Sequence, residues 1–104
     1  MTVTIIGTVT ARPECRDELD ELLRQQVEPT RAEPGCINYD FHVDAANPCV
    51  FVFYENWTSQ VDLDAHLNMP HLAPLMSQID RLLAVPFDIR HLRMLSTHIV
   101  AQTA

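Results

Sequence analysis

The sequence predicts an α+β domain of ferredoxin-like βαββαβ order, a four-stranded antiparallel sheet with both helices on one face. Runs rich in β-branched and aromatic residues occupy 3–11, 36–43, 49–57 and 87–100, which is typical of strands. Helical periodicity fills the chain after the first and third runs, and only a short turn separates the second from the third. Right-handed crossovers then place both helices on the same face of the sheet.

The first strand is bounded by Arg12-Pro13, where a helix begins. From Pro13 to about Ala32, leucines recur at helical spacing on one side and acidic residues occupy the opposite side. This pattern predicts an amphipathic helix. The pair Pro34-Gly35 follows, and because neither residue favours a helix, it separates the helix from the second strand.

The second strand alternates between apolar and polar residues, as expected when one face of a strand is buried. Its two sides are Ile37, Tyr39, Phe41 and Val43 against Asn38, Asp40 and His42. Turn-forming residues at 44–48 connect it to the third strand, so the two strands form a hairpin. The run from Val50 to Tyr54 within the third strand is apolar on both faces.

A second helix begins near Ser59, where a Ser-x-x-acid pattern offers a side-chain oxygen to an orphan backbone donor. Pro70 interrupts this helix, and a second helical segment continues with leucines on one face as far as Pro86. The last strand is expected to run from Phe87 to about Val100. No internal repeat or low-complexity linker divides the chain.

The sheet face away from the helices is the unusual feature of this fold. In the third strand that face is still apolar, whereas an exposed antiparallel sheet face should be polar. A second copy of the same sheet is the simplest cover, so we expect a homodimer. The long last strand would reach across to the partner, and two facing sheets would enclose a cavity in each subunit.

Length and composition restrict the function. At 104 residues the chain has room for one domain, residues 1–104. The net charge is −7 and all basic residues are arginines, so nucleic acid is not expected as a partner. The absence of lysine excludes lysine Schiff bases and the phosphate-binding lysine of a P-loop. Two isolated glycines cannot form a dinucleotide-binding turn.

Two further features concern compartment. The three cysteines are odd in number and lack C-x-x-C spacing, so they indicate neither a disulfide framework nor a zinc site. The N-terminus has no basic start, and no apolar run approaches the ~20 residues of a membrane span. We therefore expect a cytoplasmic protein without a membrane partner.

Three motifs occur in the order of these elements. They are Pro34-Gly35-Cys36 with Tyr39, then Phe53-x-Glu55-x-Trp57, and finally His66-Leu67-x-x-Pro70-His71. Together they resemble the antibiotic biosynthesis monooxygenase domain, a quinol-monooxygenase-like member of the dimeric α+β barrel group. The resemblance spans the chain from Val3 to about Leu95.

The resemblance implies oxidation of a small electron-rich aromatic metabolite, such as a quinol, an anthrone or a naphthol, by molecular oxygen. No metal, flavin or other cofactor is implied. A deprotonated aromatic enolate can itself give an electron to oxygen, so the protein needs only a base, a stabilised anion and a dry pocket. The missing cofactor motifs agree with this chemistry.

Histidine is the natural general base near neutral pH, and His66 is the first candidate because the break at Pro70 should place its helix end at the cavity mouth. The alternative is that His66 caps the helix C-terminus. His71 is the second candidate for the base. Five residues across a proline make the two histidines a poor metal-ligand pair, so no metal site is expected.

Further candidates lie on the second and third strands. Tyr39 could donate to a developing oxyanion, and Phe53 and Trp57 could contact a planar substrate, although aromatic residues also serve as core. Asn38 could hold a substrate oxygen, or else face solvent or a dimer interface. Glu55 could contact substrate, but a buried carboxylate needs a partner, for which Arg90 or Arg93 is expected.

Two other functions remain open. The same fold resembles isomerases of small phosphorylated or keto sugars, in which histidine and tyrosine would move a proton without oxygen. A non-catalytic dimer that binds a hydrophobic metabolite is the third possibility. Oxygen dependence separates the first two, and the net negative charge disfavours anionic substrates.

Overall fold

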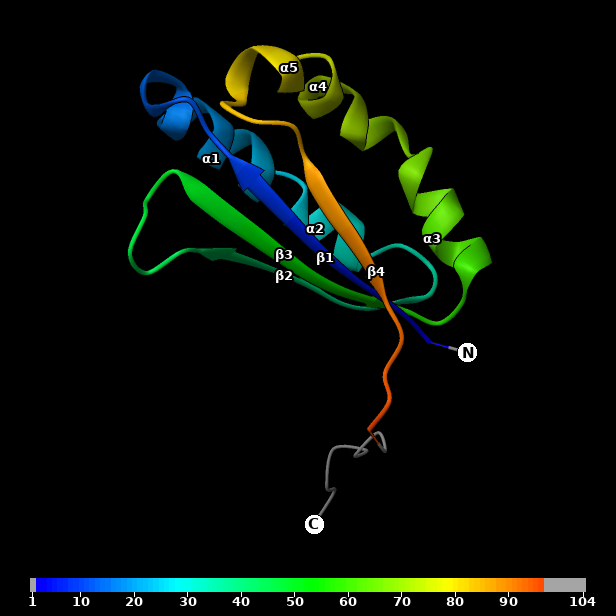
Figure 1. Ribbon diagram of the computed structural model, residues 1–104. Helices are drawn as coiled ribbons and strands as arrows, with labels where there is room; N and C mark the ends of the chain where they lie inside the picture. The colour runs from blue at the N-terminus through cyan, green and yellow to red at the C-terminus, as the bar shows by residue number, and fades with distance from the viewer. Residues whose placement is uncertain (1, 97–104) are drawn as a thin grey trace.

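The computed structural model describes residues 2–96 and contains the expected four-stranded antiparallel sheet. Its strands are β1 (Val3–Thr10), β2 (Cys36–Val43), β3 (Val50–Trp57) and β4 (Asp88–Leu92), in the order β2-β3-β1-β4. This order is the ferredoxin-like one, and the helices all lie on one side of the sheet (Figure 1). The predicted fold class is therefore confirmed.

Each predicted helical region is divided into short segments. The first contains the 3-10 turn η1 (Pro13–Cys15), α1 (Arg16–Arg24) and α2 (Val27–Arg31). The second contains α3 (Gln60–Leu67), η2 (Pro70–Leu72), α4 (Ala73–Met76) and α5 (Ile79–Leu82). Pro70 breaks the second region as expected, because proline lacks the backbone donor that a continuous helix requires. In residues 2–96, no helix combines the length and the apolar character that crossing a bilayer would require.

The core lies between the sheet and the helices. Alternate residues of β1 and β3 point to the helices, and the main buried cluster contains Val9, Leu19, Leu23, Phe51 and Leu82. A smaller cluster of Ile5, Trp57 and Leu63 closes the end of the sheet near α3. Burying these large side chains is the main favourable contribution to folding.

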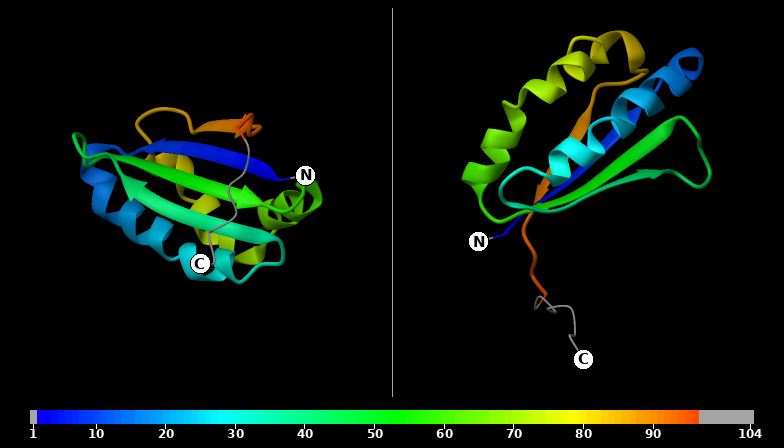
Figure 2. Two further views of the ribbon diagram at one scale, coloured as in Figure 1. Left: turned by 90° about the horizontal axis from the view of Figure 1, so that it is seen from below. Right: turned by 180° about the vertical axis from the view of Figure 1, so that it is seen from behind.

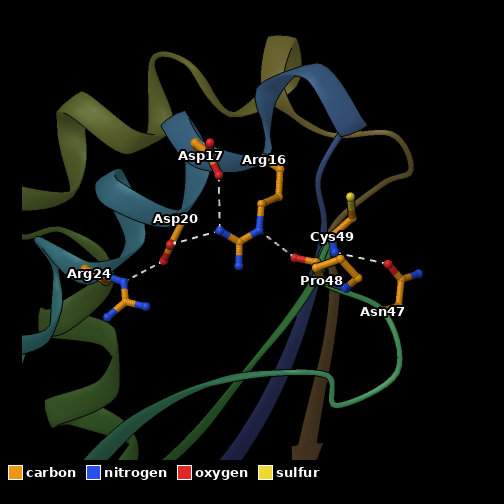
Figure 3. Close-up of polar contacts among 7 residues, drawn as sticks. All are labelled: Arg16, Asp17, Asp20, Arg24, Asn47, Pro48 and Cys49. Atoms are coloured by element: carbon orange, nitrogen blue, oxygen red, sulfur yellow. Dashed lines mark hydrogen bonds and ion pairs between the residues drawn. The ribbon is translucent and has the colours of Figure 1, made fainter.

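A charged network joins the start of α1 to the β2–β3 hairpin loop (Figure 3). Arg16 donates from Nε to the carbonyl oxygen of Pro48 at 2.8 Å and pairs through Nη1 with Asp20 Oδ2 at 3.2 Å. Arg24 Nε contacts the other oxygen of Asp20 at 2.7 Å. These contacts attach the helix layer to the loop at the end of the sheet opposite α3.

No helix within residues 2–96 covers the outer face of the sheet (Figure 2, left). Ile6 of β1 and Val52 and Tyr54 of β3 lie on this face, and Tyr54 is half-exposed. Ile6 is opposite Tyr54 in the β1–β3 pairing, and Val52 is opposite Thr8. The polar side of β2 lies on this face as predicted, with Asn38 opposite Asn56 and His42 opposite Val52.

The last strand is shorter than the sequence predicts. It ends at Leu92, residues 93–96 are not in a strand, and residues 97–100 of the expected strand lie outside the described residues. All five β4 residues are exposed, including Ile89. The apolar pattern that predicted a long strand therefore marks an exposed apolar edge rather than an extended pairing with β1.

Candidate functional site

A cavity of about 280 Å³ lies between the sheet and the second helical region. Its apolar wall includes Ile5, Phe53, Leu63, Leu75, Phe87 and Ile89. Three ionisable or hydroxyl-bearing side chains from the predicted set, Tyr39, Glu55 and His66, also line it. This cavity forms within one chain, on the helix side of the sheet, whereas the expected cavity between two facing sheets needs a second copy and stays a prediction. Its volume is near the lower end of the roughly 300–1,000 Å³ of small-molecule pockets.

His66 is held in the cavity wall by the local structure of α3. The Ser59 hydroxyl accepts from Asp62 N at 3.2 Å and caps the helix, which fixes where its last turn falls. The His66 ring is buried and lies 4.8 Å from the Trp57 ring, centroid to centroid. Its Nδ1 donates to Glu33 Oε2 at 2.9 Å, so this nitrogen does not cap the helix.

Glu33 is the centre of a buried polar cluster. Its side chain is 6% exposed, and Oε2 accepts from both His66 Nδ1 and His71 Nε2, the latter at 2.7 Å. The other ring nitrogen of His71 lies 2.7 Å from Gln26 Oε1, so Gln26 orients His71 in turn. Two regions far apart in sequence, the end of the first helical region and the α3–η2 segment, thus meet at one carboxylate oxygen.

The Glu33 carboxylate determines which nitrogen of His66 is free. A carboxylate only accepts hydrogen bonds, so His66 Nδ1 carries the proton of the 2.9 Å contact. In the neutral ring Nε2 is then an unprotonated acceptor, and no protein partner is found for it in the described part of the chain. A histidine oriented by a buried carboxylate in this way is suited to act as a general base.

Tyr39 contributes a hydroxyl to the same cavity. Its ring is buried and lies 5.4 Å from the Phe53 ring and 5.9 Å from the His66 ring. Burial, reinforced by the negative charges of Glu55 and Glu33, raises the pKa of the Tyr39 hydroxyl far above its usual value. The hydroxyl therefore stays protonated and is available to donate a hydrogen bond to a bound anion.

Glu55 is buried in the wall and is paired with an indole rather than a cation. Trp57 Nε1 donates to Glu55 Oε1 at 2.9 Å. Burial raises the pKa of the Glu55 carboxyl, an effect that the Trp57 hydrogen bond and the nearby His66 partly offset. The expected ion pair with Arg90 or Arg93 is wrong: within residues 2–96 neither arginine pairs with Glu55, and Arg90 lies 3.5 Å from Asp88 instead.

The comparisons with known proteins agree with this architecture. The family model of the antibiotic biosynthesis monooxygenases matches residues 2–75. The chain belongs to this family. "Putative monooxygenase Rv0793" of Mycobacterium tuberculosis is 34% identical over 87 residues, covering 84% of this chain and 85% of that protein. Its solved structure superposes with a TM-score of 0.88 over 93% of this chain and 98% of that one.

Two further proteins similar to this chain extend the comparison. The structure of PA3566 from Pseudomonas aeruginosa has a TM-score of 0.86 at 34% identity and covers 91% of this chain and 95% of that chain. "Uncharacterized protein sll1783" of Synechocystis is 30% identical over 95 residues, 91% of this chain. The chain spans only 65% of the length of that Synechocystis protein.

Within this family fold, Trp57 and Asn38 both lie outside the cavity. Trp57 is fully buried behind His66 and Glu55 and does not line the cavity, so it supports the site and cannot stack on a bound ligand. Asn38 lies on the outer face of the sheet, where its amide donates to Asp40 Oδ2 and its oxygen accepts from Asn56. The assignment of Trp57 as a cavity contact is therefore wrong, and Asn38 has the outward position that was its alternative.

Glu33 and Gln26 belong to the site, although neither was a candidate from the sequence. Gln26 lies within the helix predicted over residues 13–32, and Glu33 follows that helix directly. Gln26 is 3% exposed in the structure, although neighbouring Gln25 is exposed. The one signal in the sequence was the position of Glu33 immediately before Pro34-Gly35, where the tight turn returns the chain toward α3. Thr58 N, just before α3, donates to the carbonyl oxygen of Gly35 at 2.9 Å.

Proposed function

We propose that this chain is a cofactor-independent monooxygenase that oxidises an electron-rich aromatic compound of the quinol, anthrone or naphthol type with molecular oxygen. The observation that carries the proposal is the 2.9 Å hydrogen bond from His66 Nδ1 to the buried Glu33, with the His66 ring in the wall of an apolar cavity. Membership of the monooxygenase family supports the reaction class.

In the proposed reaction, His66 Nε2 takes the phenolic or enolic proton of the substrate, and Glu33 stabilises the imidazolium that results. The substrate anion gives one electron to oxygen, and recombination at a ring carbon forms a hydroperoxide. Loss of water leaves a carbonyl at that carbon. One oxygen atom enters the product, and the other leaves as water with two hydrogens from the substrate, so the substrate is the only reductant.

Tyr39 and Glu55 provide the polar contacts of the proposed reaction. The protonated Tyr39 hydroxyl can donate to the substrate oxygen as its negative charge develops. Glu55, whose pKa is raised by burial, can hold a proton near the site where the hydroperoxide loses water. The apolar walls exclude bulk water, which strengthens both interactions.

We also propose that the protein works as a cytoplasmic homodimer. Large apolar side chains remain exposed on the outer face, along β4 and just after it, among them Tyr54, Ile89, Leu92 and Leu95. A second copy would cover this surface and the open side of the cavity near Ile89. Light scattering coupled to size exclusion tests this, and a monomer at micromolar concentration would contradict it.

One observation favours a second candidate function, a small-molecule isomerase. Glu55 and His66 both line the cavity, so one buried carboxyl and one imidazole could donate and remove a proton on the same substrate. That reaction needs no oxygen. A non-catalytic metabolite-binding dimer would use the same cavity and show binding without turnover.

The test is oxygen uptake by chelator-treated protein with a panel of quinols, anthrones and naphthols. The parent chain is compared with His66→Ala, and with His42→Ala as the control because His42 lies on the outer face of the sheet, away from the cavity. Loss of a general base should lower the rate by about 10²-fold or more. Added imidazole should partly restore the rate of His66→Ala, because the substitution leaves a space of that shape.

The outcomes separate the candidates. Uptake above autoxidation that requires His66 supports the monooxygenase. Proton exchange or isomerisation under argon, without oxygen uptake, would replace the monooxygenase with the isomerase. Ligand binding with neither reaction would leave the binding protein.

A further inference from the structure

The buried cluster of Glu33, His66 and His71 has the composition of a metal-ligand set. Each residue offers one ligand atom, and these three atoms lie within 4.8 Å of one another. The rest of the described chain, residues 2–96, contains no other such group. Two imidazoles and one carboxylate suit divalent first-row transition metals such as Zn²⁺ and Fe²⁺. We propose that Glu33, His66 and His71 bind one divalent transition-metal ion of this class.

The spacing of the ligand atoms favours this proposal. Glu33 Oε2 lies 2.9 Å from His66 Nδ1 and 2.7 Å from His71 Nε2. Two ligand atoms that each lie about 2.0–2.2 Å from an ion, with a ligand–metal–ligand angle of about 90°, are about 3 Å apart. Small rotations of the two imidazole rings would therefore make room for the ion. The expectation from sequence that these histidines make a poor ligand pair considered only their five-residue spacing and omitted the third ligand.

A second observation comes from the other oxygen of Glu33. Oε1 is buried and has no hydrogen-bond partner, although the side chain is only 6% exposed. A buried carboxylate oxygen without a partner is costly. A cation bound at this carboxylate would offset that cost.

The surroundings of His71 also suit a ligand. Its Nδ1 lies 2.7 Å from Gln26 Oε1, which leaves Nε2 directed at Glu33. Metal-binding histidines usually hydrogen-bond through their second nitrogen in this way, and the bond fixes which nitrogen faces the ion. His71 is 23% exposed, so the ion has an entry route on this side of the cluster.

Binding has a consequence that rests on the proposed function. An ion on His66 Nδ1 replaces the proton there, so the neutral ring carries its remaining proton on Nε2. That nitrogen can then no longer take a proton from a substrate. Bound metal is therefore expected to inhibit oxygen uptake.

The experiment is isothermal titration of chelator-treated protein with Zn²⁺. We expect one ion per chain, and binding at least about tenfold weaker in Glu33→Gln and in His71→Ala. Gln26→Met keeps the three ligands and removes only the contact to His71 Nδ1, so it should weaken binding by about tenfold. His42→Ala and His91→Ala should bind as the parent does, and circular dichroism verifies that every variant is folded.

Substitution by Co²⁺ distinguishes this site from the cysteines. Nitrogen and oxygen ligands give visible d–d bands without thiolate charge-transfer bands in the near ultraviolet. Equal Zn²⁺ affinity in the parent and Glu33→Gln, a thiolate band, or no binding would each overturn the proposal. Because binding is measured without substrate, Zn²⁺ binding in a chain that consumes no oxygen would contradict only the monooxygenase, and oxygen uptake without Zn²⁺ binding only the metal site.

Discussion

Glu33 Oε2 lies 2.9 Å from His66 Nδ1, although 33 residues separate the two in sequence. The contact joins the end of the first helical region to the last turn of α3, and both side chains are about 95% buried. It fixes the ring of the proposed base and identifies Glu33 as the residue that positions it. Four predictions follow from this site and its surroundings.

Glu33→Gln should lower the oxygen-uptake rate by about 10²-fold or more, because the amide cannot stabilise a His66 imidazolium. The two hydrogen bonds with the histidines also become neutral ones, which should lower the free energy of unfolding by about 1–3 kcal/mol in total. Urea unfolding and oxygen-electrode kinetics measure the two effects. Glu28→Gln, at an exposed carboxylate in α2, is the matched control and should change neither. Parent-like kinetics in Glu33→Gln would remove Glu33 from the mechanism.

Glu55→Gln should make the chain relatively more stable as the pH rises. Burial raises the pKa of this carboxyl in the folded state, so the folded chain holds the proton more tightly than the unfolded chain does. As the pH rises, the parent therefore loses stability between the pKa of Glu55 in the unfolded chain, about 4.3, and its higher pKa in the folded chain. Glutamine cannot ionise and avoids this loss.

The measurement for Glu55 is urea unfolding of both chains from about pH 4 to pH 7. The difference in free energy of unfolding between Glu55→Gln and the parent should grow in favour of the variant across that range. Glu21→Gln, at an exposed position of α1, should show no such trend. A difference that shrinks with rising pH would mean that Glu55 is stabilised as the carboxylate.

Gly7→Val should narrow the cavity. A Cβ at Gly7 would lie 3.2 Å from Phe87 Cε1 and 3.7 Å from Phe53 Cδ2, so both rings must shift to accommodate a larger side chain. Overpacking of this kind costs about 1–3 kcal/mol. Binding of three-ring compounds should weaken more than that of one-ring compounds in a fluorescence titration. Equal weakening for both sizes would place the ligand elsewhere.

Gly35→Ala should destabilise the fold by about 1–3 kcal/mol. Gly35 has φ of +81°, which other residues rarely adopt, and a Cβ there would collide with the Asp62 carboxyl group. Gly35→Asn is the variant to compare with it, because asparagine tolerates a positive φ but also carries a Cβ. If both variants lose the same stability in urea unfolding, the collision dominates, whereas a smaller loss in Gly35→Asn would assign the cost to the backbone.

The strands and the helix break could be predicted because their signals are local. The alternation around Tyr39 and the apolar run ending at Trp57 each predict a strand and its two faces, and Pro70 cannot continue the helix that precedes it. The short β4 could not be predicted, because its apolar residues are typical of a strand whether or not a partner strand continues beside them. The direction of Asn38 followed from alternation, but the position of the cavity did not.

The sequence by itself determined the order of the elements, the polar and apolar side of each strand, and the family motifs that contain Tyr39, Glu55 and His66. These features depend on residues a few positions apart, where backbone geometry sets which side chains share a face. Only the tertiary structure decided that the cavity lies on the helix side of the sheet and that Trp57 pairs with Glu55. It also decided that Gln26, Glu33, His66 and His71 form one cluster. Such contacts depend on how the helices pack on the sheet, and spacing along the chain does not encode that distance.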